Sequence, residues 1–172
     1  MKKNLFSTTL TMLCTVAMLL AATLKTQAQT PAEWKAMKGN VTMYMTNDMG
    51  RNGYYDQKPI AELMGHMGET LGPKCVLAVG DIHHFNGVAS VNDPLWTTNY
   101  EQIYSHPELM LNWFPVLGNH EYRGNTQAVL DYGTVSRRWV MPSRYYTKVI
   151  TSKGTSVRVV FIDTTPLIDR YR

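Results

Sequence analysis

The chain has 172 residues, 44% of them hydrophobic and 17% charged, which suits one globular domain and excludes two well-buried ones. Lysine and arginine total 17 against 13 acidic residues, but Lys2, Lys3 and Lys25 lie in a segment that we expect to be removed, which leaves 14 against 13. This near-neutral balance argues against nucleic acid or an anionic membrane surface as a partner.

The first 28 residues have the pattern of a secretory signal peptide. A basic start at Lys2-Lys3 precedes a mostly apolar run over residues 10–24, and Thr26-Gln27-Ala28 offers a cleavage site. The run is about 15 residues long, which is short for crossing a hydrocarbon core of about 30 Å. We therefore predict a secreted or periplasmic protein with no membrane attachment after cleavage, and a mature lead-in over residues 29–40. An uncleaved membrane anchor is the alternative.

Strand-type and helix-type patterns alternate from residue 41 onward. Period-two alternation and short apolar runs predict strands, whereas an apolar repeat of three to four residues predicts helices. The predicted strands cover residues 41–46, 75–79 and 113–117, the predicted helices cover 57–71, 94–105 and 125–132, and a predicted hairpin covers 145–162. This order indicates an α/β fold with a mostly parallel or mixed sheet and covering helices.

The longest predicted helix, over residues 57–71, has one apolar stripe that we expect to face the core. The stripe consists of Ile60, Leu63, Met64, Met67 and Leu71. We expect Asp56 to cap the start of this helix and Gly72-Pro73 to end it.

Polar side chains follow three successive predicted strands. Asp48 and Asp81 lie 33 positions apart, and Asn119 follows 38 positions after Asp81, each interval being roughly one βαβ unit. Neighbouring strand ends lie about 5 Å apart, so these side chains can converge on one site. Carboxylate, amide and imidazole groups suit a metal ion, while the plainer reading of an aspartate after a strand is a turn or helix-cap residue.

Three sequence motifs carry a resemblance to a known family. Asn47-Asp48-Met49-Gly50, Gly80-Asp81 with Gly87-Val88, and Gly118-Asn119-His120-Glu121 resemble the signatures of the calcineurin-like metallophosphoesterase superfamily, and within it the purple acid phosphatases of the tartrate-resistant type. The resemblance runs over residues 41–167. It implies an α/β fold of the four-layer α/β/β/α sandwich type, of which residues 41–172 form an incomplete domain with the first sheet and the start of the second.

The resemblance also implies a role for each matching residue. Asp48 takes the position of a carboxylate ligand of the first metal ion, Asp81 that of a carboxylate bridging both ions, and Asn119 that of the second ion's amide ligand. His120 matches the catalytic histidine that contacts substrate phosphate and helps to protonate the leaving group. Glu121 is expected to orient a histidine without ligating metal. The implied cofactor is a pair of metal ions, iron with iron, zinc or manganese.

Two departures from the family pattern affect these expectations. Where the purple enzymes have a tyrosine that ligates ferric iron, this chain has His84, which either replaces the tyrosine as a metal ligand or lines the site. His83 has the opposite strand phase and is expected to point elsewhere. The family's remaining ligands are histidines in two later motifs, but no histidine follows His120. We therefore expect a truncated copy of a longer enzyme, with an apolar exposed face where its second half would pack.

The leading functional hypothesis is a secreted metal-dependent phosphatase that hydrolyses phosphomonoesters of small phosphorylated substrates. Phosphodiester or nucleotide hydrolysis is the near alternative within the same chemistry. A non-catalytic secreted metal-binding module and an inactive fragment are the hypotheses from other classes.

Overall fold

The computed structural model describes residues 30–171, so the signal peptide predicted for residues 1–28 lies outside the described part. Residues 34–171 belong to one compact unit, which the following paragraphs describe. The helices are α2 (Pro31–Met37), α3 (Gln57–Leu71) and α4 (Thr126–Asp131), and the strands are β1 (Tyr44–Thr46), β2 (Cys75–Val79), β3 (Asn112–Val116), β4 (Tyr145–Ser152) and β5 (Thr155–Ile162). Within residues 30–171, no helix has the length and apolar character needed to span a membrane.

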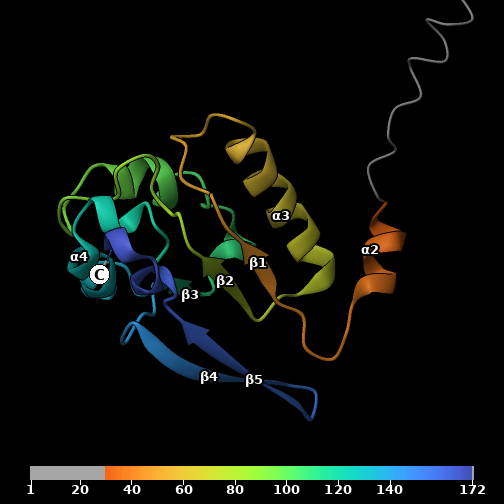
Figure 1. The fold of residues 1–172 in the computed structure, drawn as a ribbon. Coiled ribbons are helices and arrows are strands. Elements are labelled where there is room, and N and C mark those ends of the chain that lie inside the picture. The colour runs from red at the N-terminus through yellow and green to blue at the C-terminus, as the bar shows by residue number, and fades with distance from the viewer. Residues whose placement is uncertain (1–29, 172) are drawn as a thin grey trace, which may run out of the picture. The chain divides into compact units, whose positions relative to one another are not determined.

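Three parallel strands form the first sheet, in the order β1-β2-β3 (Figure 1). Met45 of β1 lies opposite Leu77 of β2, and Leu77 lies opposite Phe114 of β3. Because neighbouring parallel strands end at the same edge of a sheet, the loops that follow β1, β2 and β3 leave from one edge. The sheet thus brings the three polar loops together as predicted.

Different parts of the chain cover the two faces of this sheet. Val76 and Trp113 point into a core that includes α3, α4 and the buried aromatic side chains of the segment between β2 and β3. Leu77 and Phe114 point the other way and pack with Phe161 of β5. Figure 1 shows α3 and the β4–β5 hairpin on opposite sides of the sheet. The result is the mixed α/β arrangement expected for a partial metallophosphoesterase fold.

Helix α3 has the predicted boundaries but buries a different face. Ile60 and Leu63 of the predicted apolar stripe are 49% and 46% exposed, so this part of the prediction is wrong. The buried face instead carries small side chains, because another segment approaches the helix backbone closely. A Cβ atom on Gly65 would lie 2.3 Å from Cγ of His106, so only glycine fits there. The helix ends at Gly72, whose N–H donates to Gly68 O at 2.8 Å.

The start of α3 is held by a side chain other than the predicted cap. Asp56 has a left-handed backbone and its side chain makes no capping hydrogen bond. The neighbouring Gln57 is buried and accepts from the N–H groups of Arg51 (3.0 Å) and Gly53 (2.8 Å), while its amide donates to Asn99 O at 2.7 Å. Gln57 therefore ties the loop after β1 to the π-helical turn Thr97–Glu101.

The β4–β5 hairpin has the predicted boundaries and turn, with Lys153 and Gly154 at positive φ between its strands. Its inner face packs against the sheet, where the Tyr146 hydroxyl donates to Pro115 O at 2.6 Å. Its outer face is exposed and carries both apolar and polar side chains, so the exposed apolar face that we expected is present only in part. The large apolar side chains exposed there are Tyr145, Val149, Val160 and Ile162, and they alternate with Thr147, Thr151, Ser156 and Arg158.

Candidate metal centre

Two aspartates occupy equivalent positions just beyond neighbouring strands. Asp48 follows β1 and Asp81 follows β2, and both have φ of 51°, in the left-handed region that aspartate tolerates better than most residues. The N–H of Asp48 donates to the carbonyl of Gly80 at 3.2 Å, which joins the two loops. A shared backbone geometry therefore turns both carboxylates toward the same edge of the sheet.

The loop after β3 approaches Asp81 closely. A Cβ atom on Gly118 would lie 2.3 Å from Oδ1 of Asp81, so a larger residue at this position would displace the carboxylate. The N–H of His120 donates to the same Oδ1 atom at 3.0 Å. These contacts fix the orientation of the Asp81 side chain, which is only 18% exposed.

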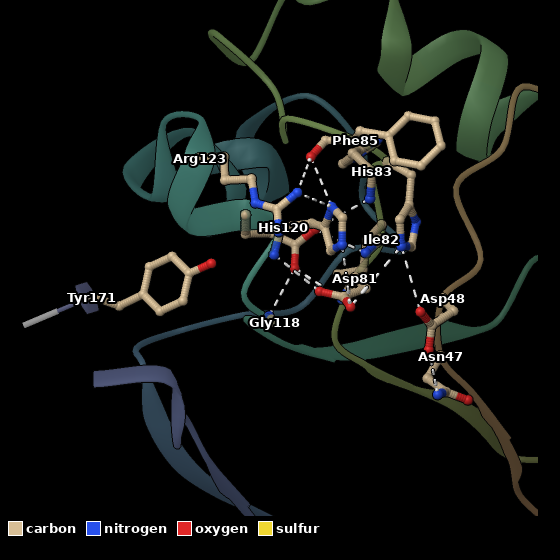
Figure 2. Close-up of polar contacts among 12 residues, drawn as sticks. Asn47, Asp48, Asp81, Ile82, His83, Phe85, Gly118, His120, Arg123 and Tyr171 are labelled. Carbon is tan, nitrogen blue, oxygen red and sulfur yellow. Dashed lines mark hydrogen bonds and ion pairs between the residues drawn. The ribbon is translucent and has the colours of Figure 1, made fainter. Parts of the chain in front are cut away.

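The side chains of Asp81, His84 and His120 form one cluster of potential ligands (Figure 2). Oδ2 of Asp81 lies 4.0 Å from Nε2 of His84 and 4.0 Å from Nε2 of His120. Asp48 reaches the cluster from the other side, with its Oδ1 atom 3.4 Å from Nε2 of His84. The structure thus brings together four of the residues predicted for this site: Asp48, Asp81, His84 and His120.

The surroundings of His84 favour the neutral form of its ring, although Asp81 and Asp48 oppose this effect. Its side chain is 3% exposed, and burial lowers its pKa, an effect reinforced by the neighbouring His120 and Arg51. A neutral imidazole has a free electron pair, which is the form that binds a metal ion. The ring of His84 lies against that of His120, with centroids 4.1 Å apart.

The ring of His120 is oriented by a backbone carbonyl. Its Nδ1 atom lies 2.7 Å from Phe85 O, and a carbonyl can only accept, so Nδ1 carries a proton. The opposite nitrogen, Nε2, therefore faces Asp81 and is the atom that can exchange a proton or bind an ion.

Glu121 holds the loops together from beneath. It is fully buried, and its two oxygens accept four backbone N–H groups: those of Asp81 (2.9 Å), Ile82 (2.8 Å), His83 (3.1 Å) and Gly118 (2.7 Å). We expected this carboxylate to orient a histidine, but its contact with a histidine is with a backbone N–H and not with a ring. Burial raises the pKa of Glu121, and the N–H donors oppose that effect.

His83 lies outside the cluster, in the aromatic core. Its ring is fully buried, packs edge-on against Trp96 and contacts Asn99, with Nδ1 at 3.2 Å from the amide nitrogen. The two adjacent histidines thus separate, with one at the metal-ligand cluster and the other in the core.

A cavity of about 590 Å³ extends from the cluster along the sheet edge. Asp48, Asp81 and Asn119 line its polar end, so Asn119 shares a cavity with both carboxylates. Its walls farther along are apolar and come from β2, β3 and β5. Three of the sequence-predicted residues therefore line this cavity, while His84 and His120 contact Asp81 without lining it.

A comparison with known families identifies this arrangement. A family model described as calcineurin-like phosphoesterase matches residues 42–169, which is most of the chain. The chain belongs to the calcineurin-like phosphoesterase family.

Individual relatives within this phosphoesterase family are acid phosphatases. Purple acid phosphatase 3 of Arabidopsis thaliana is 36% identical over 135 residues, which cover 77% of this chain and 36% of that protein. Purple acid phosphatase 4 of the same plant is 31% identical over 162 residues, covering 93% and 46%. Tartrate-resistant acid phosphatase type 5 of Oryctolagus cuniculus is 34% identical over 110 residues, covering 62% and 34%. The chain thus spans less than half the length of these relatives.

The residues present fit the dinuclear metal site that the phosphoesterase family implies. Carboxylate oxygens from Asp48 and Asp81 lie 3.4 and 4.0 Å from Nε2 of the buried His84 imidazole, a donor set that accepts iron, zinc or manganese. Asn119, whose amide oxygen is a potential ligand, lines the same cavity.

Two arginines at this phosphoesterase site were not anticipated from the sequence. Arg51 lies over the ring of Phe85, 5.1 Å from its centroid, and Nη1 of Arg123 lies 3.3 Å from Nδ1 of His120. Among the side chains that the structure describes, the arginine–carboxylate ion pairs are Arg138–Glu101 and Arg144–Asp163, and Arg51 and Arg123 form none. The signal in the sequence was their position, since each follows a family motif within two residues.

Proposed function

We propose that this chain contributes to the catalytic centre of a metal-dependent phosphatase of the acid phosphatase type, which hydrolyses phosphomonoesters of small molecules. The observation that carries the proposal is the convergence of two imidazoles on one carboxylate oxygen, with Nε2 of His84 and Nε2 of His120 each 4.0 Å from Oδ2 of Asp81. The family and the acid phosphatase relatives support the reaction class.

Four side chains of this chain would contribute ligands to the two metal ions. Asp48, Asp81, His84 and Asn119 supply carboxylate, imidazole and amide donors, and we propose iron paired with iron, zinc or manganese. When bound, such ions act as Lewis acids toward a phosphoryl group and supply a nucleophile at neutral pH. Gly118 approaches Asp81 closely and Glu121 accepts its N–H, and these two contacts would set the position of the carboxylate that we propose as a ligand.

His120 and the two arginines would act on the substrate. The carbonyl of Phe85 keeps a proton on Nδ1 of His120, so a second proton on Nε2 would make the ring cationic beside Asp81. In that form Nε2 can donate its proton to the departing alkoxide of the substrate. Arg123 lies beside the His120 ring and Arg51 lies over Phe85, and both positive charges can attract the phosphate dianion.

Metal analysis together with a phosphatase assay tests this proposal. The purified chain is stripped with a chelator, reloaded with iron, zinc or manganese, and assayed with p-nitrophenyl phosphate. We expect two ions per chain and metal-dependent turnover, and both should be lost in Asp81→Asn. Bound metal without turnover would support a non-catalytic metal-binding module instead, and failure to bind metal would overturn the assignment of the centre.

The role of His120 is tested by its dependence on the leaving group. In His120→Asn, hydrolysis of an alkyl phosphate should slow by at least about tenfold more than that of p-nitrophenyl phosphate, because an activated aryl group leaves without a proton. Equal slowing of the two substrates would contradict the acid role. The absorption spectrum of the iron-loaded protein tests His84, since imidazole ligation predicts no intense purple band and a phenolate ligand predicts one.

We also propose that the protein is exported, on the evidence of the basic start and short apolar run within residues 1–28. N-terminal sequencing of protein recovered outside the cytoplasm should begin at residue 29. Recovery in the membrane fraction with the first residues intact would instead support an anchor.

A further inference from the structure

A second group of potential metal ligands lies on α3. His66 and Glu69 stand one turn apart on the helix, and His106 contacts them from the loop that precedes the short 3₁₀ helix Pro107–Leu109. The three ligand atoms lie within 4.8 Å of one another. None of these residues belongs to the candidate metal centre.

The distances within this group suit a tetrahedral ion. Oε1 of Glu69 lies 3.7 Å from Nδ1 of His66 and 3.5 Å from Nε2 of His106. Ligands bound tetrahedrally at about 2.1 Å are separated by about 3.4 Å, so the observed spacings need only small side-chain adjustments. Two imidazoles and one carboxylate, with a fourth position open to water, form a donor set that favours zinc, nickel or copper over magnesium or calcium.

The packing of α3 holds His106 in place for such a site. The imidazole lies directly against Gly65, where a Cβ atom would be 2.3 Å from its Cγ atom. Its Nδ1 atom accepts from the N–H of Glu108 at 3.2 Å, which points Nε2 toward Glu69. An ion bound at Nε2 requires the ring proton to move to Nδ1, so the Glu108 N–H would lose this acceptor. Binding therefore exchanges one neutral hydrogen bond for a metal–nitrogen bond. The Glu108 N–H loses its acceptor, so the NMR signal of this amide should report on metal binding.

We propose that His66, Glu69 and His106 form a surface site for a divalent transition metal ion, with zinc as the expected occupant. The ion would link α3 to the segment before Pro107, two parts of the chain separated by about 40 positions. Because the ligands converge only in the folded chain, zinc would raise the melting temperature through this site. The proposal is independent of the proposed phosphatase activity.

A zinc titration followed by amide NMR tests this site separately from the candidate metal centre. The full chain, stripped of metal with a chelator, is compared with the variants His66→Gln and Glu69→Gln. The side chains of His66 and Glu69 are 64% and 59% exposed, so we expect these substitutions to leave the core unchanged. The matched control is Glu62→Gln, an exposed carboxylate on the same helix outside the group.

In the parent chain we expect saturable shifts of the Glu69 and Glu108 amides on adding zinc. The zinc affinity obtained from these amide shifts should fall at least about tenfold in His66→Gln and in Glu69→Gln. This is the lower end of the loss of metal affinity caused by mutating a residue that supports a metal ligand. It should stay within about twofold in Glu62→Gln. Shifts that persist in His66→Gln, an equal loss in Glu62→Gln, or no shift at Glu108 would each overturn the proposal.

Discussion

Replacing Glu121 at the candidate metal centre should lower the free energy of unfolding by an amount that can be worked out from its hydrogen bonds. In Glu121→Gln the side chain keeps its size, but one of its two oxygens becomes an NH₂ group. Oε1 accepts from Ile82 and His83, and Oε2 accepts from Asp81 and Gly118. Whichever way the amide turns, two buried N–H groups face a donor.

The magnitude follows from the number of lost acceptors. A buried donor left without a partner costs about 1–3 kcal/mol, so two of them predict a loss of about 2–6 kcal/mol in the free energy of unfolding. This is a large fraction of the about 5–15 kcal/mol that a domain of this kind has. The surviving oxygen also loses its charge, which weakens the two remaining hydrogen bonds.

Urea unfolding followed by tryptophan fluorescence measures this loss, since Trp96, Trp113 and Trp139 are buried. Both the parent chain and Glu121→Gln are extrapolated linearly to water, and Glu62→Gln, an exposed carboxylate, is the control expected to stay within about 0.5 kcal/mol. A loss below about 1 kcal/mol for Glu121→Gln would refute the reasoning, because it would mean that the four N–H groups do not depend on the carboxylate.

Two further predictions concern the same region of the chain. Gly118→Ala places a Cβ atom 2.3 Å from Oδ1 of Asp81, so the metal affinity measured by calorimetry should fall at least about tenfold. The control Gly39→Ala, where the atom nearest to the new Cβ is 3.5 Å away, should leave the metal affinity unchanged. An equal effect of both substitutions would count against the steric argument. Burial lowers the pKa of His83 to about 3. Below the ordinary histidine value of about 6.5 the unfolded chain therefore binds a proton that the folded chain does not, and stability falls by about 2 kcal/mol between pH 6.5 and 5. His83→Phe should remove this part of the pH dependence of urea unfolding, and an unchanged slope would contradict it.

The strand ends could be predicted because they depend on local patterns. A short apolar run gave the boundaries of β2, period-two alternation gave those of the hairpin, and Asp48, Asp81 and Asn119 lie in the loops that follow strands. Parallel order then brought Asp48 and Asp81 to one edge without further information. The family motifs supplied the roles of these residues.

The features that could not be predicted depend on contacts between distant segments. The apolar stripe on α3 suggested a buried face through Ile60 and Leu63, but the close approach of His106 makes Gly65 the buried position. Likewise, nothing near Glu121 in the sequence indicates that three of its four partners would be backbone N–H groups of residues some 40 positions earlier. Hydrophobic periodicity describes one element at a time and does not include such approaches.

The contact between Gly65 and His106 also constrains how the chain folds. Gly65 and Gly68 each weaken α3 by about 1 kcal/mol relative to alanine, so the isolated 15-residue helix is not stable in water. Helix α3 is stabilised mainly by packing against the segment around His106, about 40 positions later in the chain. This contact can form only after the intervening chain, which includes β2, has brought the two segments together. Formation of α3 is therefore coupled to long-range contacts, and the folding rate should follow the slow regime of non-local topologies and not the fast regime of helical proteins.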